Sequence, residues 1–146
     1  NYFITSLLQG RLADFTEMLK KYLVETLSVF DVKGTNPERF YHGFVVGLIS
    51  NTLETHIIKS NRESGYGRYD VIIMPKDLTK QNALGLILEF KVAKQNEKDL
   101  LASAEEALAQ IEKRHYEAEL KQAGIQKIIK VGLAFAGQQV EVVFKD

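Results

Sequence analysis

Two acidic residues and a lysine stand out in the middle of the sequence. Asp70 lies in one segment typical of a β-strand, and Glu89 and Lys91 lie in the next. Successive side chains of a strand point to opposite faces, so Glu89 and Lys91, two residues apart, share one face. Leu88 and Phe90 point to the other face, where they can anchor the strand in a core. Two carboxylates and an ammonium group that converge at a sheet edge would suit a divalent metal ion and a phosphodiester.

The composition is that of one globular domain. The chain has 146 residues, of which 45% are hydrophobic and 26% charged, enough to bury a sizeable core. It has no run of about 18 apolar residues and no basic and apolar leader, so we expect no membrane span, no signal peptide and a cytoplasmic location. It also has no cysteine, which excludes disulfides and thiolate sites. Any metal must therefore be bound by oxygen or histidine.

Charge and motifs narrow the chemistry further. The formal net charge is zero, so bulk attraction cannot by itself bring nucleic acid to the chain. Between positions 59 and 98, eight Lys or Arg face five Asp or Glu, a local positive surplus. The sequence has no HExxH motif, no GxSxG motif, no cysteine–histidine pair and no P-loop spacing. Hydrolysis through a side-chain nucleophile is therefore disfavoured.

Hydrophobic spacing predicts an α/β order of two helices, three strands, one helix and two strands, or ααβββαββ. Apolar residues three and four apart predict the helices, and apolar runs bounded by turn residues predict the strands. The last helix should cross over between strands and end at Gly124. The strand before it is apolar almost throughout, as expected of a central strand. The helices are predicted at about 4–30, 37–54 and 97–123, and the strands at 56–62, 68–74, 83–92, 127–135 and 140–144.

Two of these segments resemble a known family. ESGYGRYD, from Glu63 to Asp70, followed by ILEFK, from Ile87 to Lys91, resembles the motifs of the PD-(D/E)XK nuclease superfamily. More narrowly, the chain is similar to the nuclease-like domain found C-terminal to an AAA-ATPase-like domain in bacteria and archaea. The resemblance extends over about 40–144. It implies a restriction-endonuclease-like core, with a central mixed β-sheet of about five strands flanked by helices.

The resemblance also implies a domain organisation. We expect one nuclease-like domain over 1–146, as a C-terminal fragment of a longer protein. Within it, 1–34 would form an N-terminal packing helix and 37–146 the nuclease core. The expected partners are nucleic acid, with DNA preferred, and an AAA-ATPase-like domain upstream in the same chain.

Matching the family motif position by position assigns roles to single residues. Asp70 matches the first acidic position, Glu89 the second and Lys91 the lysine, although a tyrosine stands where the motif name has proline. Related nucleases add a carboxylate from a helix, and Glu54 is the candidate for it here. Glu54 could instead be a solvated acid at the end of its helix. They also carry a glutamine on the helix after the catalytic strand, and Gln110 is the candidate for it here. Gln110 could instead be an ordinary surface residue.

The expected cofactor is Mg²⁺, with Mn²⁺ as a substitute. Mg²⁺ prefers oxygen ligands, keeps several waters and is commonly held by one or two carboxylates. Asp70, Glu89 and the backbone carbonyl of Phe90 are the predicted ligands, and Lys91 would orient or help deprotonate the attacking water. The competing interpretation is an exposed ion pair on an edge strand between Glu89 and Lys91, with no function.

The predicted hairpin before Asp70 offers residues for substrate. Arg68 is suited to a phosphate because its planar fork can donate two hydrogen bonds. Glu63 and Arg68 could equally bridge the turn, and Glu63 is also a candidate metal ligand. Tyr66 could stack on a base or could simply be exposed at the hairpin tip.

A glutamine and a tyrosine four residues apart mark some exonuclease relatives. Here Tyr116 lies six residues after Gln110, and on one continuous helix it would point well away from it. The sequence therefore favours a metal-dependent nuclease that does not belong to this exonuclease subtype. The alternative is a catalytically inactive nuclease-fold module that binds nucleic acid or a partner protein beside an ATPase domain.

Overall fold

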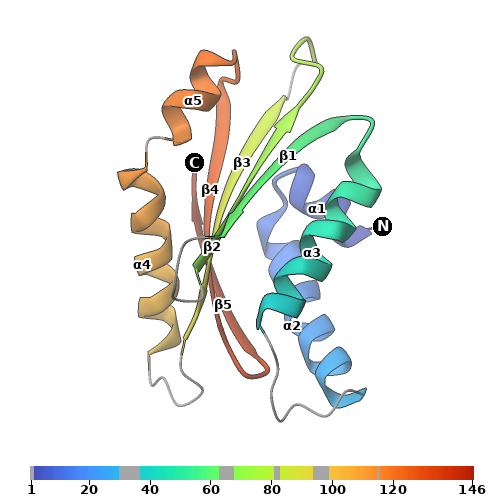
Figure 1. Cartoon of the computed structure of the whole chain (residues 1–146), viewed down its shortest axis with the longest axis vertical. Coiled ribbons are helices and arrows are strands. Elements are labelled where there is room, and N and C mark those ends of the chain that lie inside the picture. Colours follow the sequence, from blue (N-terminus) through green and yellow to red (C-terminus); the bar gives the residue numbers. More distant parts are fainter. Residues whose placement is uncertain (1, 30–36, 63–67, 81–82, 94–98, 115) are drawn as a thin grey trace.

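A computed structural model describes residues 2–29, 37–62, 68–80, 83–93, 99–114 and 116–146 (Figure 1). None of the described helices has the length and apolar character needed to cross a membrane. The helices are α1 (Tyr2–Leu8), α2 (Leu12–Val29), α3 (Pro37–Thr52), α4 (Leu100–Lys113) and α5 (Tyr116–Gln122). The strands are β1 (His56–Arg62), β2 (Arg68–Pro75), β3 (Leu84–Val92), β4 (Lys127–Ala136) and β5 (Gln139–Lys145).

The strands form one five-stranded mixed sheet in the order β1-β2-β3-β4-β5. Neighbouring strands are antiparallel except β3 and β4, which run parallel. A parallel pair needs a crossover, and α4 and α5 provide it. Helices α1, α2 and α3 cover one face of the sheet, and α4 and α5 cover the other (Figure 1). These observations confirm the predicted α/β fold, the mixed sheet and the crossover.

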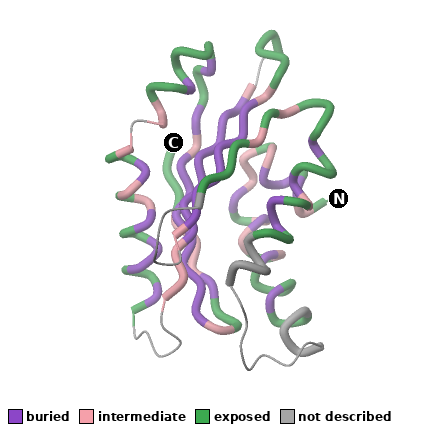
Figure 2. The backbone as a smooth tube through the Cα atoms, in the orientation of Figure 1, coloured by how far each residue is buried: buried purple, intermediate pink, exposed green. Residues whose placement is uncertain are grey.

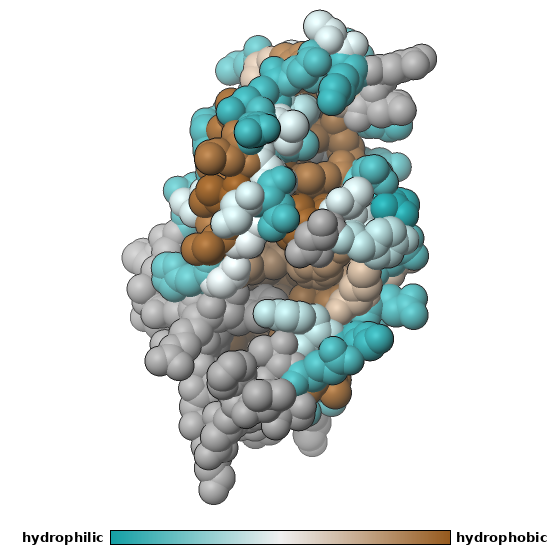
Figure 3. Space-filling model, turned by 90° about the vertical axis from the view of Figure 1, so that its right-hand side faces the viewer, coloured by the Kyte–Doolittle hydropathy of each residue, from teal (hydrophilic) through white to brown (hydrophobic). Residues whose placement is uncertain are grey.

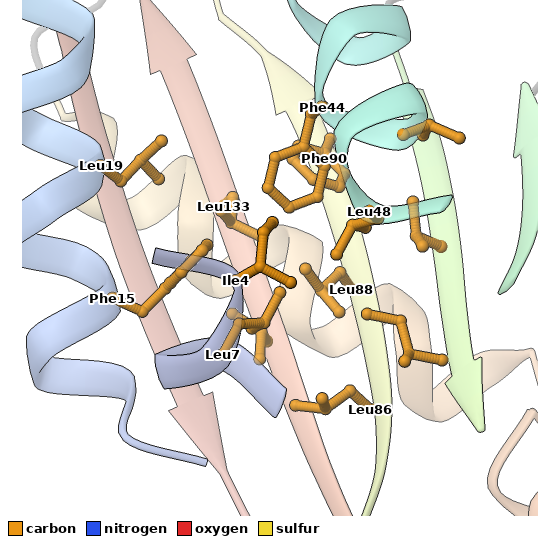
Figure 4. Close-up of a cluster of buried hydrophobic side chains, with 14 of the residues drawn as sticks. Ile4, Leu7, Phe15, Leu19, Phe44, Leu48, Leu86, Leu88, Phe90 and Leu133 are labelled. Atoms are coloured by element: carbon orange, nitrogen blue, oxygen red, sulfur yellow. The ribbon is translucent and has the colours of Figure 1, made fainter. Parts of the chain in front are cut away.

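The larger core lies between the sheet and α1–α3. Alternate residues of β3 point into it, including Leu88 and Phe90, as predicted. Figure 4 shows these side chains meeting Ile4, Phe15 and Phe44 from the three helices. Every residue of β3 from Leu84 to Phe90 is buried, and the middle of the sheet is buried throughout (Figure 2). β3 is therefore a central strand with its register fixed by the core on this face.

The face under α4 and α5 carries two smaller apolar clusters. One joins Ile72, Ile87 and Ile111 with neighbours from α5 and β4, and the other joins Leu100 and Ala104 with small residues of β4. Asp70, Glu89 and Lys91 lie on this same face of the sheet. The apolar contacts thus fix α4 and α5 on the sheet.

The predicted helix from 4 to 30 is wrong in one respect, because the structure has two helices there. α1 ends at Leu8 and α2 begins at Leu12. Gly10 between them has φ of 75°, and its N–H bonds to the carbonyl of Leu7 while the N–H of Arg11 bonds to that of Ser6. This is the Schellman pattern that ends a helix. An apolar spacing that continued across Gly10 concealed the turn.

The predicted helix from 97 to 123 is likewise two helices. α4 ends at Lys113 and α5 begins at Tyr116, although no glycine or proline lies nearby. The nearly buried ammonium group of Lys130 on β4 is 2.9 Å from Glu112 in α4 and 2.6 Å from Glu117 in α5. One cation therefore holds the helix ends on both sides of the break. Gly124, with φ of 97°, ends α5 as predicted.

Gly132 on β4 determines how closely α4 approaches the sheet. A Cβ added there would lie 2.4 Å from the carbonyl oxygen of Ala104 and 2.6 Å from the backbone nitrogen of Leu108. The helix backbone therefore rests directly on the strand. Gly132 is also the register partner of Glu89, so this close approach occurs beside one of the predicted site residues.

Candidate active site

Asp70 and Glu89 form a buried pair of acids in the middle of the sheet. They are direct register partners on β2 and β3, so their side chains project from the same face with Cβ atoms about 5 Å apart. Their exposed fractions are 0% and 1%. Ile72 and Ile87, two residues from each, lie in the cluster under α4 and α5. The acid pair therefore faces the crossover helices and is covered by them.

Glu89 is a carboxyl group in an unfavourable environment for charge. Neither of its oxygens has a hydrogen-bond partner among the described residues. Burial, reinforced by the charge of Asp70 and opposed by that of Arg68, raises its pKa from 4.5 to about 8. Burying an ion without a partner costs several kcal/mol, and keeping the proton avoids that cost. A cation beside the pair would remove the same cost.

Asp70 is held by groups from two other elements. The hydroxyl of Tyr116, the first residue of α5, donates to its Oδ2 at 2.9 Å. The Arg114 guanidinium at the end of α4 is 3.8 Å from the same oxygen. Burial raises the pKa of Asp70, while hydrogen bonds from Tyr116 and from Asn61, its register partner on β1, act in the opposite direction. These contacts fix the orientation of Asp70.

A cationic pair lies next to the acid pair on the same face. Arg68 and Lys91 are register partners, and each is two residues from one of the acids. Glu106 of α4 accepts a hydrogen bond from Lys91 through Oε2, and its Oε1 lies 3.6 Å from the Arg68 guanidinium. The hydrogen bond from Lys91 and the two positive charges hold the pKa of Glu106 below its usual range.

The competing interpretation, an edge-strand ion pair between Glu89 and Lys91, is wrong. β3 is the central strand, and Lys91 pairs with Glu106. Phe90, between them, packs its ring in the opposite core.

Gln110 lies half-buried on α4, one turn after Glu106 and one turn before Arg114. All three therefore follow one stripe of the helix, at the side where Arg114 contacts Asp70 and Glu106 contacts the cationic pair. This stripe places Gln110 at the edge of the site.

Glu54 is not brought to the site. It follows α3 on the opposite face, exposed, just before β1. His56 at the start of β1 pairs with Pro75, whereas Asn61 pairs with Asp70, and five residues of strand span about 17 Å. Glu63 and Tyr66 lie outside the described residues.

The sequence interpretation missed four residues that contact this site. Asn61, Glu106, Arg114 and Tyr116 were assigned no role there, and the angle used to place Tyr116 assumed a continuous helix. Because α4 ends before it, Tyr116 turns back toward the sheet and bonds to Asp70. The polar residues four apart on α4 were the available signal for Glu106 and Arg114.

The geometry can hold a divalent cation with oxygen ligands. No group of three or more His, Asp or Glu suited to a metal is present in the described ranges. Two carboxylates are nevertheless within the number that a hydrated Mg²⁺ takes from protein. The buried Glu89 oxygens beside Asp70 are the feature that fits such an ion.

Comparison with known proteins finds a similarity at the level of a family. A family model described as the PD-(D/E)XK nuclease superfamily matches residues 36–145. No curated protein and no solved structure matches the chain. The match covers the whole sheet and both crossover helices.

Proposed function

Because the chain belongs to the PD-(D/E)XK nuclease superfamily, we propose that it is a metal-dependent nuclease that hydrolyses phosphodiester bonds in DNA. The observation that carries the proposal is the buried Glu89 carboxyl beside Asp70, with no hydrogen-bond partner among the described residues. Such a pair destabilises a protein unless something offsets the charge. The acid pair lies beside the cations Arg68 and Lys91, and this arrangement suits a reaction on a phosphate better than a structural role.

The acid pair and the Phe90 backbone carbonyl would hold Mg²⁺, or Mn²⁺ in its place. The ion would offset charge on the phosphate and lower the pKa of a bound water. Tyr116 keeps Asp70 oriented through its hydrogen bond to Oδ2. The hydrogen bonds from Tyr116 and Asn61 lower the pKa of Asp70 against the effect of its burial, and the Arg114 guanidinium lies 3.8 Å from the same oxygen.

The cationic pair and Gln110 would act on substrate. Lys91 would orient the attacking water beside Glu89, and Arg68 would bind a non-bridging oxygen of the phosphate. The water oxygen bonds to phosphorus as the water gives up a proton to solvent, the bond to the leaving oxygen breaks, and the leaving oxygen takes up a proton from solvent. Gln110 would donate to the phosphate from the edge of the site. Glu63 as a further ligand and Tyr66 as a base-stacking residue belong to the same proposal.

A cleavage assay tests this function. The purified protein is incubated with linear, circular, branched and single-stranded DNA and with RNA, in Mg²⁺, Mn²⁺ or EDTA. We expect metal-dependent cleavage that Asp70→Ala and Lys91→Ala each reduce by about 100-fold or more without loss of fold. Glu105→Gln, an exposed acid on α4, should cleave as the wild type does. Retained cleavage by either site variant would remove the assignment.

A second candidate is a non-cutting module that binds a partner protein, such as an ATPase domain upstream in the same chain. The outer side of α3 favours it, because Val46 and Ile49 on this helix and Leu53 just after its end are 60%, 39% and 66% exposed. Figure 3 faces this side and shows apolar atoms among polar ones. Survival of every substrate, with no Mg²⁺ binding by calorimetry, would favour this candidate over the nuclease.

A further inference from the structure

Glu106 forms ion pairs with both members of the cationic pair, Arg68 and Lys91. One of its carboxylate oxygens accepts from Lys91, and the other lies 3.6 Å from Arg68. Its side chain is 52% exposed, whereas those of Lys91 and Arg68 are 21% and 29% exposed. The carboxylate therefore sits at the solvent side of two partly buried cations.

A phosphodiester matches this carboxylate in charge and in shape. Each carries one negative charge over two oxygens, and a non-bridging phosphate oxygen accepts from arginine or lysine as a carboxylate oxygen does. Two cations facing one carboxylate leave a net positive charge. That charge remains available to an incoming anion.

We propose that Arg68 and Lys91 form a phosphodiester subsite that Glu106 fills in the free protein and that a nucleic-acid phosphate takes over on binding. The inference rests on the proposed function for the identity of the ligand. It adds a residue, Glu106, that competes with substrate and so lowers affinity for nucleic acid.

The exchange is energetically easy because Glu106 is at the surface. An exposed ion pair contributes little, since water and salt compensate both charges when it opens. Removing the competitor should therefore strengthen binding of a phosphodiester by about twofold to fivefold, the factor that such an ion pair contributes. If Glu106 instead held Arg68 and Lys91 in a productive position, its removal would weaken binding.

The first test measures DNA affinity by fluorescence anisotropy, with a labelled double-stranded DNA in EDTA so that no cleavage occurs. Glu106→Gln is compared with wild type and with Glu105→Gln, which removes the same charge from the neighbouring position of α4. The inference requires Glu106→Gln to bind more tightly than both. Equal affinity of the two glutamine variants, or weaker binding by Glu106→Gln, overturns it.

The second test uses dimethyl phosphate, a phosphodiester without bases, followed by NMR of the arginine and lysine side-chain nitrogens. Glu106→Gln should bind it about twofold to fivefold more tightly than Glu105→Gln, and adding Arg68→Gln should abolish the gain. A gain that survives Arg68→Gln contradicts the subsite. If Glu106→Gln binds dimethyl phosphate more tightly but the wild type cleaves no substrate, the nuclease proposal fails and the subsite stands. If the wild type cleaves DNA but Glu106→Gln gains no affinity, only the subsite is refuted.

Discussion

Replacing Glu89 with glutamine should change the pH dependence of stability in a defined direction. The pKa of Glu89 rises from 4.5 to about 8 on folding, a difference of about 3.5 units at about 1.36 kcal/mol each. A raised pKa means that the stabilisation is complete below the unfolded value and is lost as pH rises through the folded value. Between about pH 5 and about pH 9 the wild type should therefore lose about 4 kcal/mol that Glu89→Gln does not lose.

Urea unfolding in EDTA, followed by circular dichroism across this pH range, measures the effect. The difference in free energy of unfolding between wild type and Glu89→Gln is the quantity of interest, because other titrating groups largely cancel in it. A fixed cost of burying the amide shifts the difference without changing its slope. Glu105→Gln, altered at an exposed site, should follow the wild type at every pH.

Added Mg²⁺ provides the second half of this experiment. A ligand that binds only the folded state at 100 times its Kd stabilises it by about 2.7 kcal/mol. The wild type should gain stability of this order at alkaline pH, where Glu89 is ionised, and Glu89→Gln should gain much less. A difference that stays constant with pH would refute the reasoning, because Glu89 would then ionise in the folded protein as it does in water.

Three further predictions concern the residues around the acids. Tyr116→Phe removes the donor to Asp70 and should cost about 1–3 kcal/mol of stability by urea unfolding and weaken Mg²⁺ binding by calorimetry. Gly132→Ala should lower the free energy of unfolding by about 1–3 kcal/mol or more, because the added methyl group overpacks against α4. Gly47→Ala has open space around it and should leave the free energy of unfolding unchanged or raise it by up to about 1 kcal/mol. Equal effects of the two substitutions would contradict the close approach of α4 to β4. Lys130→Met removes the cation shared by the partly exposed carboxylates of Glu112 and Glu117 and should cost about 1 kcal/mol by urea unfolding at neutral pH, falling in acid as the carboxylates protonate.

The sheet and the shared face of Glu89 and Lys91 were predictable from the sequence because their signals are local. Alternation in β3 fixed which residues face the core, so the shared face of Glu89 and Lys91 followed directly. The direct pairing of Asp70 with Glu89 was not predicted, because the sequence indicated only that the two acids converge at a sheet edge, whereas the structure places them on neighbouring strands inside the sheet. The crossover followed from a helix between two apolar strands.

The partners of the site were not predictable in the same way. Tyr116 reaches Asp70 because the helix breaks, and the break is accompanied by a contact with Lys130, a residue on a later strand. No glycine or proline marks it. Glu106 read as one surface acid among several, since only the tertiary structure shows which cations it faces.

The parallel pairing of β3 with β4 divides the site between contacts that are close in sequence and contacts that are distant in sequence. Asp70, Glu89 and Lys91 come into register as soon as β2 and β3 pair, through contacts close in sequence. The surroundings that dehydrate them come from α4, α5 and β4, which must close a long loop first, and such contacts form slowly. A fragment ending before α4 would carry Asp70, Glu89 and Lys91 without the helices that cover the acid pair. The burial that raises the pKa of Glu89 therefore comes from elements that follow β3 in the chain.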